Sequence, residues 1–286
     1  MIGTTWFGLF QGGTSNLEQF WKIFPCLVVL GSVFLQSAVS NTFADEINTS
    51  SGIPELADPL IAESPTPDNG LRFNYFFVDK LDANERIANL EAELAISSYA
   101  SIEFNVPYTF RDPSDGSGST DNLDVAELAL KIAHGLTGNV IISGGLELGL
   151  PTGDDTKGIG SNNKIIITPF LGFGAKIGAL EAIAFLGFGF PTNQQDPEER
   201  ADEDLELEYN LAFAYWFMPE ARAIVEFDAE MIVKGDDNEG VVNLTLGLIG
   251  APDDNVPLEI GGGVSFPITA DKEFDSRVIL SLLYEF

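Results

Sequence analysis

The chain has 286 residues, of which 45% are hydrophobic, and a formal net charge of −30 at pH 7. A surface this acidic repels phosphate, so nucleic acid is excluded as a partner. Outside one segment near the N-terminus, no run of about 18 apolar residues occurs, which excludes a helical membrane protein. The apolar residues must therefore be spread along the chain, one face at a time.

The N-terminal segment is typical of an export signal. Lys22 precedes an apolar stretch at residues 23–35, and small residues follow it up to Ala44. A basic residue, a short apolar core and small residues before the cut are the parts of a secretory signal peptide. We expect residues 1–44 to be removed near Ala44, with Ser40 as the next choice. The alternative is an anchoring transmembrane helix, for which the apolar core is short.

Cleavage at this point removes Cys26, the single cysteine of the chain. Disulfides, thiol catalysis and cysteine-based metal sites are then excluded for the mature protein. The next segment, residues 45–69, is rich in Pro, Ser, Asp and Glu and has no clean periodicity. We expect it to be a flexible periplasmic lead-in rather than a second domain.

Residues 70–286 form one unit of alternating strands. Apolar residues recur at every second position, which is the period of a β-strand with one apolar and one polar face. Most of the predicted strands are close to the length of about 9–11 residues that a tilted transmembrane strand needs. The twelve predicted strands are 71–79, 86–96, 101–111, 123–132, 139–150, 164–177, 180–191, 205–216, 221–234, 240–249, 256–267 and 277–286.

The connections alternate between tight and long. The links at 97–100 and 178–179 are short, whereas those at 113–122 and 152–163 are longer and rich in Asp, Gly and Asn. Short periplasmic turns and long external loops are typical of outer-membrane barrels. An even number of strands then places both termini on the periplasmic side.

The two faces of the strands differ sharply. Strand 101–111 directs Phe104 and Phe110 one way and Glu103 the other, and by this assignment the apolar face of all twelve strands carries no charged residue. Such a face suits lipid, because Arg or Lys at the bilayer midplane costs about 2–4 kcal/mol. A soluble sandwich or propeller also alternates, but it does not require loops that alternate in length. The sequence therefore predicts an all-β, transmembrane, up-and-down antiparallel barrel of about 12 strands.

Strands 164–177 and 180–191 are apolar or glycine on both faces. Phe170 or Phe185 is therefore expected to point into the lumen. We favour a packed interior wall over an apolar strip along a substrate path.

The chain ends on a strand whose final residue is aromatic. The closing strand of a barrel must pair with the first strand, so that no open edge faces lipid. This ending also resembles the signal read by the barrel-assembly machinery, which we expect as a partner together with outer-membrane lipid. The residues of this barrel-closing pattern are Phe286, Tyr284, Leu282 and Leu280.

A motif in the middle of the chain carries a resemblance to a known family. The run Gly145–Ser161 contains Leu150, Pro151, Thr152, Gly153 and Asp154 in sequence, at the end of a strand and before a glycine-rich loop. In this it resembles the outer-membrane β-barrel transporter family that includes phenol-degradation "MetA-pathway" proteins. The resemblance implies passage of small compounds, aromatic ones included, across the outer membrane of a Gram-negative bacterium. It implies no catalytic residues.

Acidic residues dominate the predicted interior. Glu226, Asp228 and Glu230 follow one another on one inward face, and we expect them to be unpaired and to repel one another or hold a counterion. A charged lumen selects ions by sign, so we expect a preference for cations. The alternative is that the carboxylates pair with the few basic residues and only keep the interior wet. The other selectivity candidates are Glu206, Glu208, Glu91, Glu93 and Glu103.

Other chemistry is excluded by what the chain lacks. The single histidine, His134, falls in a predicted periplasmic turn, at the wrong end for a lipid-cleaving Ser–His pair. We therefore predict no enzyme activity, no cofactor and no metal site. Two hypotheses remain: a channel or transporter for small solutes of unknown identity, and a non-conducting structural or adhesion barrel that presents acidic external loops.

Overall fold

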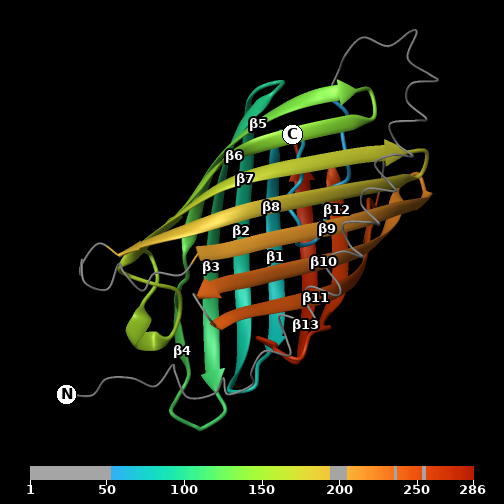
Figure 1. The fold of residues 1–286 in the computed structure, drawn as a ribbon. Helices are drawn as coiled ribbons and strands as arrows, with labels where there is room; N and C mark the ends of the chain where they lie inside the picture. The colour runs from blue at the N-terminus through green and yellow to red at the C-terminus, as the bar shows by residue number, and fades with distance from the viewer. Residues whose placement is uncertain (1–52, 194–204, 235–236, 253–255) are drawn as a thin grey trace.

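The computed structural model describes residues 53–193, 205–234, 237–252 and 256–286 (Figure 1). The predicted signal peptide and residues 45–52 lie outside the described residues. Among the residues that are described, no helix is long and apolar enough to cross a membrane.

The described strands form a closed antiparallel barrel (Figure 1). Neighbouring wall strands in the sequence pair with one another, and β1 closes the ring against β13 in a register that runs from Gly70 opposite Glu285 to Asp79 opposite Ser276. Twelve of the strands make the wall, while the short β4 (Thr120–Leu123) pairs only with β3. The wall strands are β1 (Gly70–Asp79), β2 (Ala83–Ser97), β3 (Ala100–Pro113), β5 (Ala126–Thr137), β6 (Val140–Leu150), β7 (Lys164–Ile177), β8 (Leu180–Asn193), β9 (Leu205–Met218), β10 (Ala221–Lys234), β11 (Asp237–Gly250), β12 (Leu258–Pro267) and β13 (Ser276–Glu285).

The predicted fold class and strand number are confirmed, with local differences. β2 begins three residues earlier than predicted, and β4 was not predicted. His134 lies in β5, opposite Ile142 of β6, so its predicted place in a turn is wrong. The hairpin turns within two residues, Gly138 and Asn139, which leaves the preceding residues free to pair.

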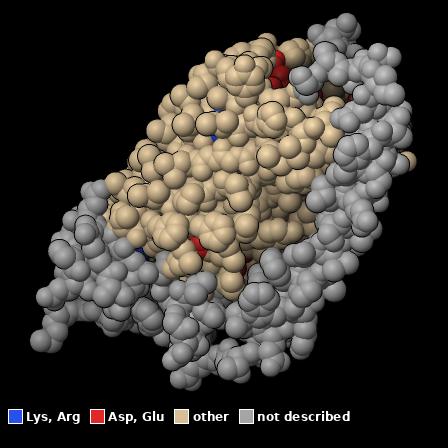
Figure 2. Space-filling model, turned by 45° about the horizontal axis from the view of Figure 1, so that its top comes forward, with Lys and Arg blue, Asp and Glu red and all other residues tan. Residues whose placement is uncertain are grey.

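The outer wall of the barrel is largely apolar. Figure 2 shows a face of the barrel almost without charged side chains. Exposed outward residues include Phe73, Leu90, Phe104 and Leu146. The prediction that no charge lies on this face is wrong at Asp79, the exposed last residue of β1, and at Arg86. Arg86 is exposed near the long-loop end of β2, with its guanidinium 5.8 Å from the ring centroid of Phe110. A long side chain at a strand end can cover apolar surface and still reach water.

Two aromatic rings fill part of the interior wall. Phe170 of β7 and Phe185 of β8 are 6% and 4% exposed, and their rings stack at 5.3 Å. On β6, a Cβ added at Gly145 would lie 2.4 Å from the ring of Phe170, so glycine makes room for the ring. The expected packed wall is therefore confirmed.

The described part of the lead-in does not extend away from the barrel. Residues 53–69, which we call the lumen segment, enter the interior before β1 begins. Their buried residues include Leu56, Ala57, Leu60 and Ala62. The expectation of a flexible lead-in is wrong for these residues, because their apolar side chains find partners on the inner wall.

The apolar outer wall predicts that a lipid bilayer surrounds the barrel, and two substitutions at different depths test this prediction. Leu146 lies in the middle of β6 and faces outward, whereas Asn84 faces outward near the long-loop end of β2. In lipid vesicles, Leu146→Arg should lower the free energy of unfolding by about 2–4 kcal/mol and Asn84→Arg by about 0–1 kcal/mol. Denaturant titration of the refolded protein measures both. Equal losses at the two depths would contradict a bilayer around this wall.

Candidate functional site

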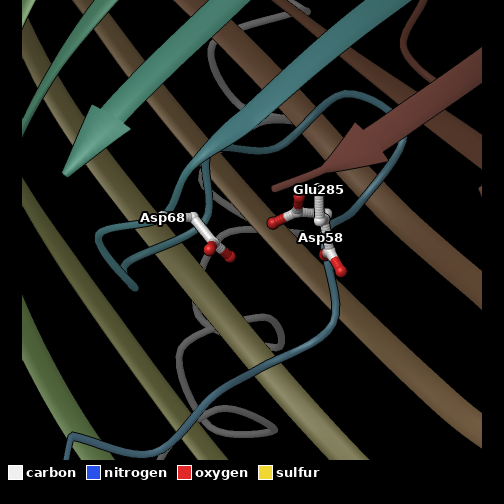
Figure 3. Close-up of side chains that lie close together, drawn as sticks. All are labelled: Asp58, Asp68 and Glu285. Atoms are coloured by element: carbon white, nitrogen blue, oxygen red, sulfur yellow. The ribbon is translucent and has the colours of Figure 1, made fainter. Parts of the chain in front are cut away.

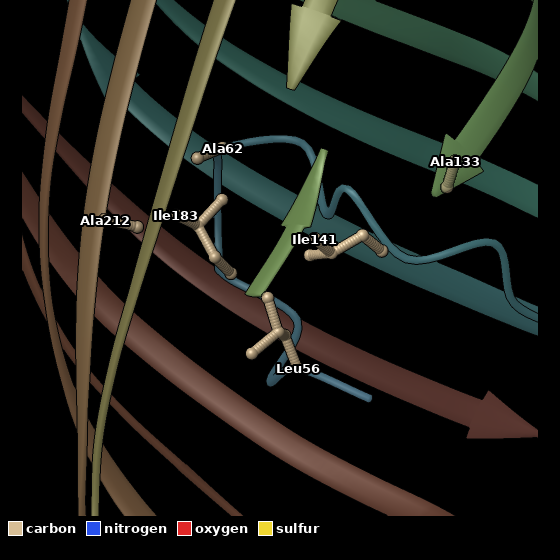
Figure 4. Close-up of a cluster of buried hydrophobic side chains, with 6 residues drawn as sticks. All are labelled: Leu56, Ala62, Ala133, Ile141, Ile183 and Ala212. Atoms are coloured by element: carbon tan, nitrogen blue, oxygen red, sulfur yellow. The ribbon is translucent and has the colours of Figure 1, made fainter. Parts of the chain in front are cut away.

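The lumen segment occupies the half of the barrel that is closed by short turns. One apolar cluster joins Leu56 and Ala62 to residues beside these turns (Figure 4). A second cluster surrounds Leu60, which is 1% exposed. The wall residues of the first cluster are Ala133, Ile141, Ile183 and Ala212, and those of the second are Ala214, Ile224 and Ile249.

Glu226 holds the centre of the lumen segment. Its carboxylate accepts hydrogen bonds from three consecutive backbone N–H groups, those of Leu60 at 2.6 Å, Ile61 at 2.9 Å and Ala62 at 3.1 Å. The residue is 1% exposed. A buried carboxylate is costly unless it is hydrogen-bonded, and backbone N–H groups bond it strongly. Glu226 is therefore an anchor for the segment rather than a free lumen charge.

Three further wall residues bond the backbone of the segment, and one of them, Glu93, accepts from the N–H of Asp68 at 3.3 Å. Glu181 accepts from the N–H of Ala57 at 2.7 Å and also from Lys176 at 2.6 Å. Arg222 donates to the carbonyl oxygen of Asp58 at 3.1 Å and forms a two-pronged pair with Glu259, both contacts at 2.6 Å.

Ion pairs hold the segment on either side of Leu60–Ala62. Arg72 of β1 pairs with Asp58 at 2.9 Å and lies 3.8 Å from Glu91. Lys131 of β5 contacts Glu63 at 3.5 Å, and on the wall it also contacts Glu93 at 3.1 Å and Glu103 at 3.8 Å. Both basic residues therefore link wall carboxylates to the segment.

Glycines of the wall make space for the two leucines. A Cβ added at Gly247 of β11 would lie 2.3 Å from Leu60 Cδ1, and Cβ atoms at Gly261 and Gly263 of β12 would lie within 2.9 Å of the same side chain. On β7, a Cβ at Gly174 would lie 2.1 Å from Leu56 Cδ1. The wall is thus shaped to receive these side chains.

An acidic cavity lies above the segment, toward the long loops. It has a volume of about 320 Å³, and Ile61 of the lumen segment contributes to its lining. Beside the segment, two further cavities of about 30 and 10 Å³ leave room for few water molecules. The charged residues that line the large cavity are Glu127, Glu147, Glu206, Glu208, Asp228, Glu230, Glu273 and Arg277.

The predicted cluster of three unpaired carboxylates is divided between two roles. Glu226 bonds the lumen segment, and Asp228 lies 3.4 Å from Arg277 and accepts from Asn243 at 2.8 Å, so the expectation is wrong for both. Glu230 lines the cavity, as do Glu206 and Glu208.

The remaining candidates, Glu91, Glu93 and Glu103, lie in the ion pairs of Arg72 and Lys131 and not at the large cavity. Two residues that line the large cavity were not predicted. Glu273 lies in a long loop without periodicity, and Asn243 carries no charge that would have marked it as a candidate.

The family motif folds the long loop after β6. Thr152 accepts from the N–H of Ala126 at 2.8 Å, and a Cβ at Gly153 would lie 2.4 Å from the backbone N of Ser161. Asp154 caps the short helix η1 (Asp155–Lys157) by accepting from the N–H of Thr156 at 3.0 Å. Hydrogen bonds from the Thr156 hydroxyl and backbone lower the pKa of Asp154. Leu150 and Pro151 lead from the strand into this loop.

The barrel-closing residues lie where they were expected. Leu280, Leu282 and Tyr284 are exposed on the outer face of β13, and Phe286 follows them. The N–H of Phe286 donates to the carbonyl oxygen of Asn69 at 3.0 Å, so the chain end meets the start of β1.

Three carboxylates lie close together, those of Asp58 and Asp68 in the lumen segment and that of Glu285 in β13 (Figure 3). Their ligand atoms lie within 4.8 Å of one another. Burial, and then the charge of Asp58, raise the pKa of Asp68. Arg72 already pairs with Asp58, which reduces the repulsion in this group.

Comparison with known proteins identifies the class of fold. No family profile and no curated protein matches the chain. The COG4313 outer membrane channel from Pseudomonas putida F1 is similar in structure, with a TM-score of 0.64 and 14% sequence identity over 81% of this chain and 100% of that one. The NanC porin gives a TM-score of 0.53 and 8% identity over 76% and 98% of the two chains. The KdgM porin in complex with disordered oligogalacturonate gives 0.50 and 12% over 76% and 99%. The chain therefore has the fold of outer-membrane barrels.

The anchor at Glu226 can be tested by a change of one atom. Glu226→Gln replaces one acceptor oxygen by a donor that faces backbone N–H groups, so at least one of the three hydrogen bonds is lost. We expect the free energy of local opening at Leu60–Ala62 to fall by about 1–3 kcal/mol. Amide hydrogen exchange measures it. Asp228→Asn, on the same face but without contact to the segment, is the control, and an equal effect there would contradict the anchor.

The fit between Leu60 and the glycine wall predicts a rescue. Gly247→Ala should displace the segment at a cost of about 1–3 kcal/mol, since the new methyl overlaps Leu60. Leu60→Ala in the same chain should relieve this overlap. The double variant should therefore lose less stability than the sum of the losses of the two single variants. The rate of limited proteolysis within residues 53–69 measures the effect.

Gly262→Ala is the matched control for this rescue. Its Cβ would meet only the carbonyl oxygen of Ile279 at 3.4 Å and Leu280 Cδ2 at 3.9 Å. We expect no change in proteolysis there. Strictly additive effects of Gly247→Ala and Leu60→Ala would refute the contact.

Proposed function

We propose that this chain is an outer-membrane channel for small solutes. The lumen segment narrows its path at the short-turn end, and the acidic cavity favours cations at the other end. Three observations support the proposal: the apolar outer wall, the closed ring of strands, and the structural similarity to an outer membrane channel.

The observation that carries the proposal is the difference between the two halves of the lumen. The long-loop half is hollow, with a cavity of about 320 Å³, whereas the short-turn half is filled by a separate segment of the chain. A barrel with a purely structural role can fill its interior with wall side chains, as small barrels do. Here the filling element is bonded to the wall by Glu226, Glu181 and Arg222, contacts that can open without unpairing any strand.

Export and orientation belong to the same proposal. Residues 1–44 act as the signal peptide, the barrel-assembly machinery inserts the barrel into outer-membrane lipid, and both termini stay periplasmic. The contact of Phe286 with Asn69 supports a common side for the chain end and the start of β1, because both lie at the short-turn end of the barrel.

The proposed cation preference follows from the lining of the cavity. Seven carboxylates face it, and Arg277 is the one basic residue among its described lining residues. A low-dielectric wall around like charges concentrates counterions. The selectivity residues are then Glu230, Glu147 and Glu208 rather than Glu226.

The second candidate is a non-conducting barrel that presents acidic external loops. The narrow spaces beside the lumen segment favour it, since cavities of about 30 and 10 Å³ admit water but not a solute. The two candidates differ in whether the segment can leave its place.

Conductance in planar bilayers separates them. We expect low conductance for the full chain and a conductance several-fold higher for Glu226→Gln/Glu181→Gln, because this variant weakens the bonds to Leu60–Ala62 and Ala57. In a salt gradient the reversal potential should indicate a preference for cations. The variant Glu230→Gln/Glu147→Gln should reduce this preference. Hydrogen exchange that reports a released segment, together with unchanged conductance, would support the non-conducting barrel instead.

A further inference from the structure

The lumen segment has acidic residues and no basic ones. They are Glu55, Asp58, Glu63 and Asp68. We propose that the lumen segment is a voltage-dependent gate, which a potential that is positive on the short-turn side draws out of the barrel. The inference rests on the proposed function in that it names what opens that channel.

The lumen segment is a loop, and both of its arms lie at the short-turn end. Leu56 in one arm and Pro65 in the other lie 2.1 and 2.8 Å from a Cβ added at Gly174, close to the end of β7. The Thr66 hydroxyl donates to the carbonyl oxygen of Pro54 at 3.2 Å and so joins the two arms. The segment therefore enters and leaves the lumen through the short-turn end.

The tip of this loop reaches into the membrane-spanning part of the barrel. Residues 60–62 bond Glu226, which lies between the short-turn end and the middle of β10. Ile61, at the tip, also lines the acidic cavity. A charge at the tip thus crosses about a third of the membrane when the loop leaves, since one strand spans the bilayer.

Release of the segment leaves the wall intact. The segment belongs to no strand, and its bonds at Glu226, Glu181 and Arg222 come from wall side chains. Proline has no N–H group to donate to a sheet, so prolines along the segment disfavour its pairing with the wall. These prolines are Pro54, Pro59, Pro65 and Pro67.

The charges that move and the charges that stay have opposite signs. Asp58 pairs with Arg72 at 2.9 Å, and Glu63 lies 3.5 Å from Lys131. Both basic residues belong to wall strands and keep their places. Asp68 lies directly before β1, which tethers it, so three of the four carboxylates move with the loop. A field across the membrane therefore pulls the segment and the wall in opposite directions.

The polarity and the steepness of opening follow from these charges. One elementary charge that crosses the whole field changes the ratio of open to closed channels by about 50-fold per 100 mV. The three carboxylates cross only part of the field, so we expect a change of about tenfold per 100 mV. A potential that is positive on the short-turn side should raise the conductance of the full chain, and the opposite potential should lower it. Planar-bilayer recordings at both polarities measure the steepness.

Ile61 allows the moving charge to be changed in both directions. Ile61→Glu adds a negative charge at the tip and should make the voltage dependence about three- to fourfold steeper per 100 mV, whereas Ile61→Lys should make it shallower by the same factor. Ile61→Gln is the uncharged control and should leave the steepness unchanged. The steepness is the readout, because repulsion or attraction by the acidic cavity shifts only the midpoint potential.

A protease identifies the element that moves and the side to which it moves. In the closed barrel Glu63 is half-buried beside Lys131. A glutamate-specific protease outside lipid vesicles should cut after Glu63 about tenfold faster when a diffusion potential of 100 mV is positive outside than when it is negative outside. Only barrels with the short-turn end outward expose this site, so the barrels need no sorting by orientation. Mass spectrometry measures the cut, and Glu63→Gln, which removes it, is the control.

The gate and the channel fail separately. Conductance with equal steepness in Ile61→Glu and Ile61→Lys, or with cleavage that does not depend on polarity, would refute the gate and leave the channel intact. Cleavage that follows polarity, without conductance at any potential, would leave the voltage-dependent movement of the segment intact and remove the channel.

Discussion

The closure of the strand ring is the constraint on which the rest of the structure depends. In hydrocarbon, every backbone N–H and C=O group needs a partner within the protein, and only a closed sheet provides one for each strand. The pairing of β1 with β13 along their full length meets this requirement. Closure also fixes which residues face inward, because side chains alternate along every strand. The lumen, with its carboxylates and its glycines, is a direct result.

Local periodicity explains why the barrel could be predicted from the sequence. Alternation is visible within a single strand, so the strands, their outward faces and the closing strand could all be predicted from the sequence. The difference at Arg86 arises at a strand end, where the alternation continues beyond the apolar surroundings that require it. The placement of His134 failed because a two-residue turn allows pairing up to the turn itself.

The lumen segment could not be predicted in this way, because its structure comes from distant contacts. Leu60 and Glu226 are 166 positions apart in the sequence, and the segment has no period of its own. A signal was nevertheless present: inward positions at Gly247, Gly261 and Gly263 lack side chains where a barrel wall would need them. Glycines on a lumen face indicate that another part of the chain fills the space.

The anchor at Glu226 has a consequence for the order of assembly. Glu226, Glu181 and Arg222 belong to strands synthesised long after the lumen segment, and their carboxylate and guanidinium groups converge only when the ring has formed. The lumen segment is thus made before every wall strand but is the last to find its binding site. Until then, its leucines and backbone N–H groups lack the wall residues that bury and bond them.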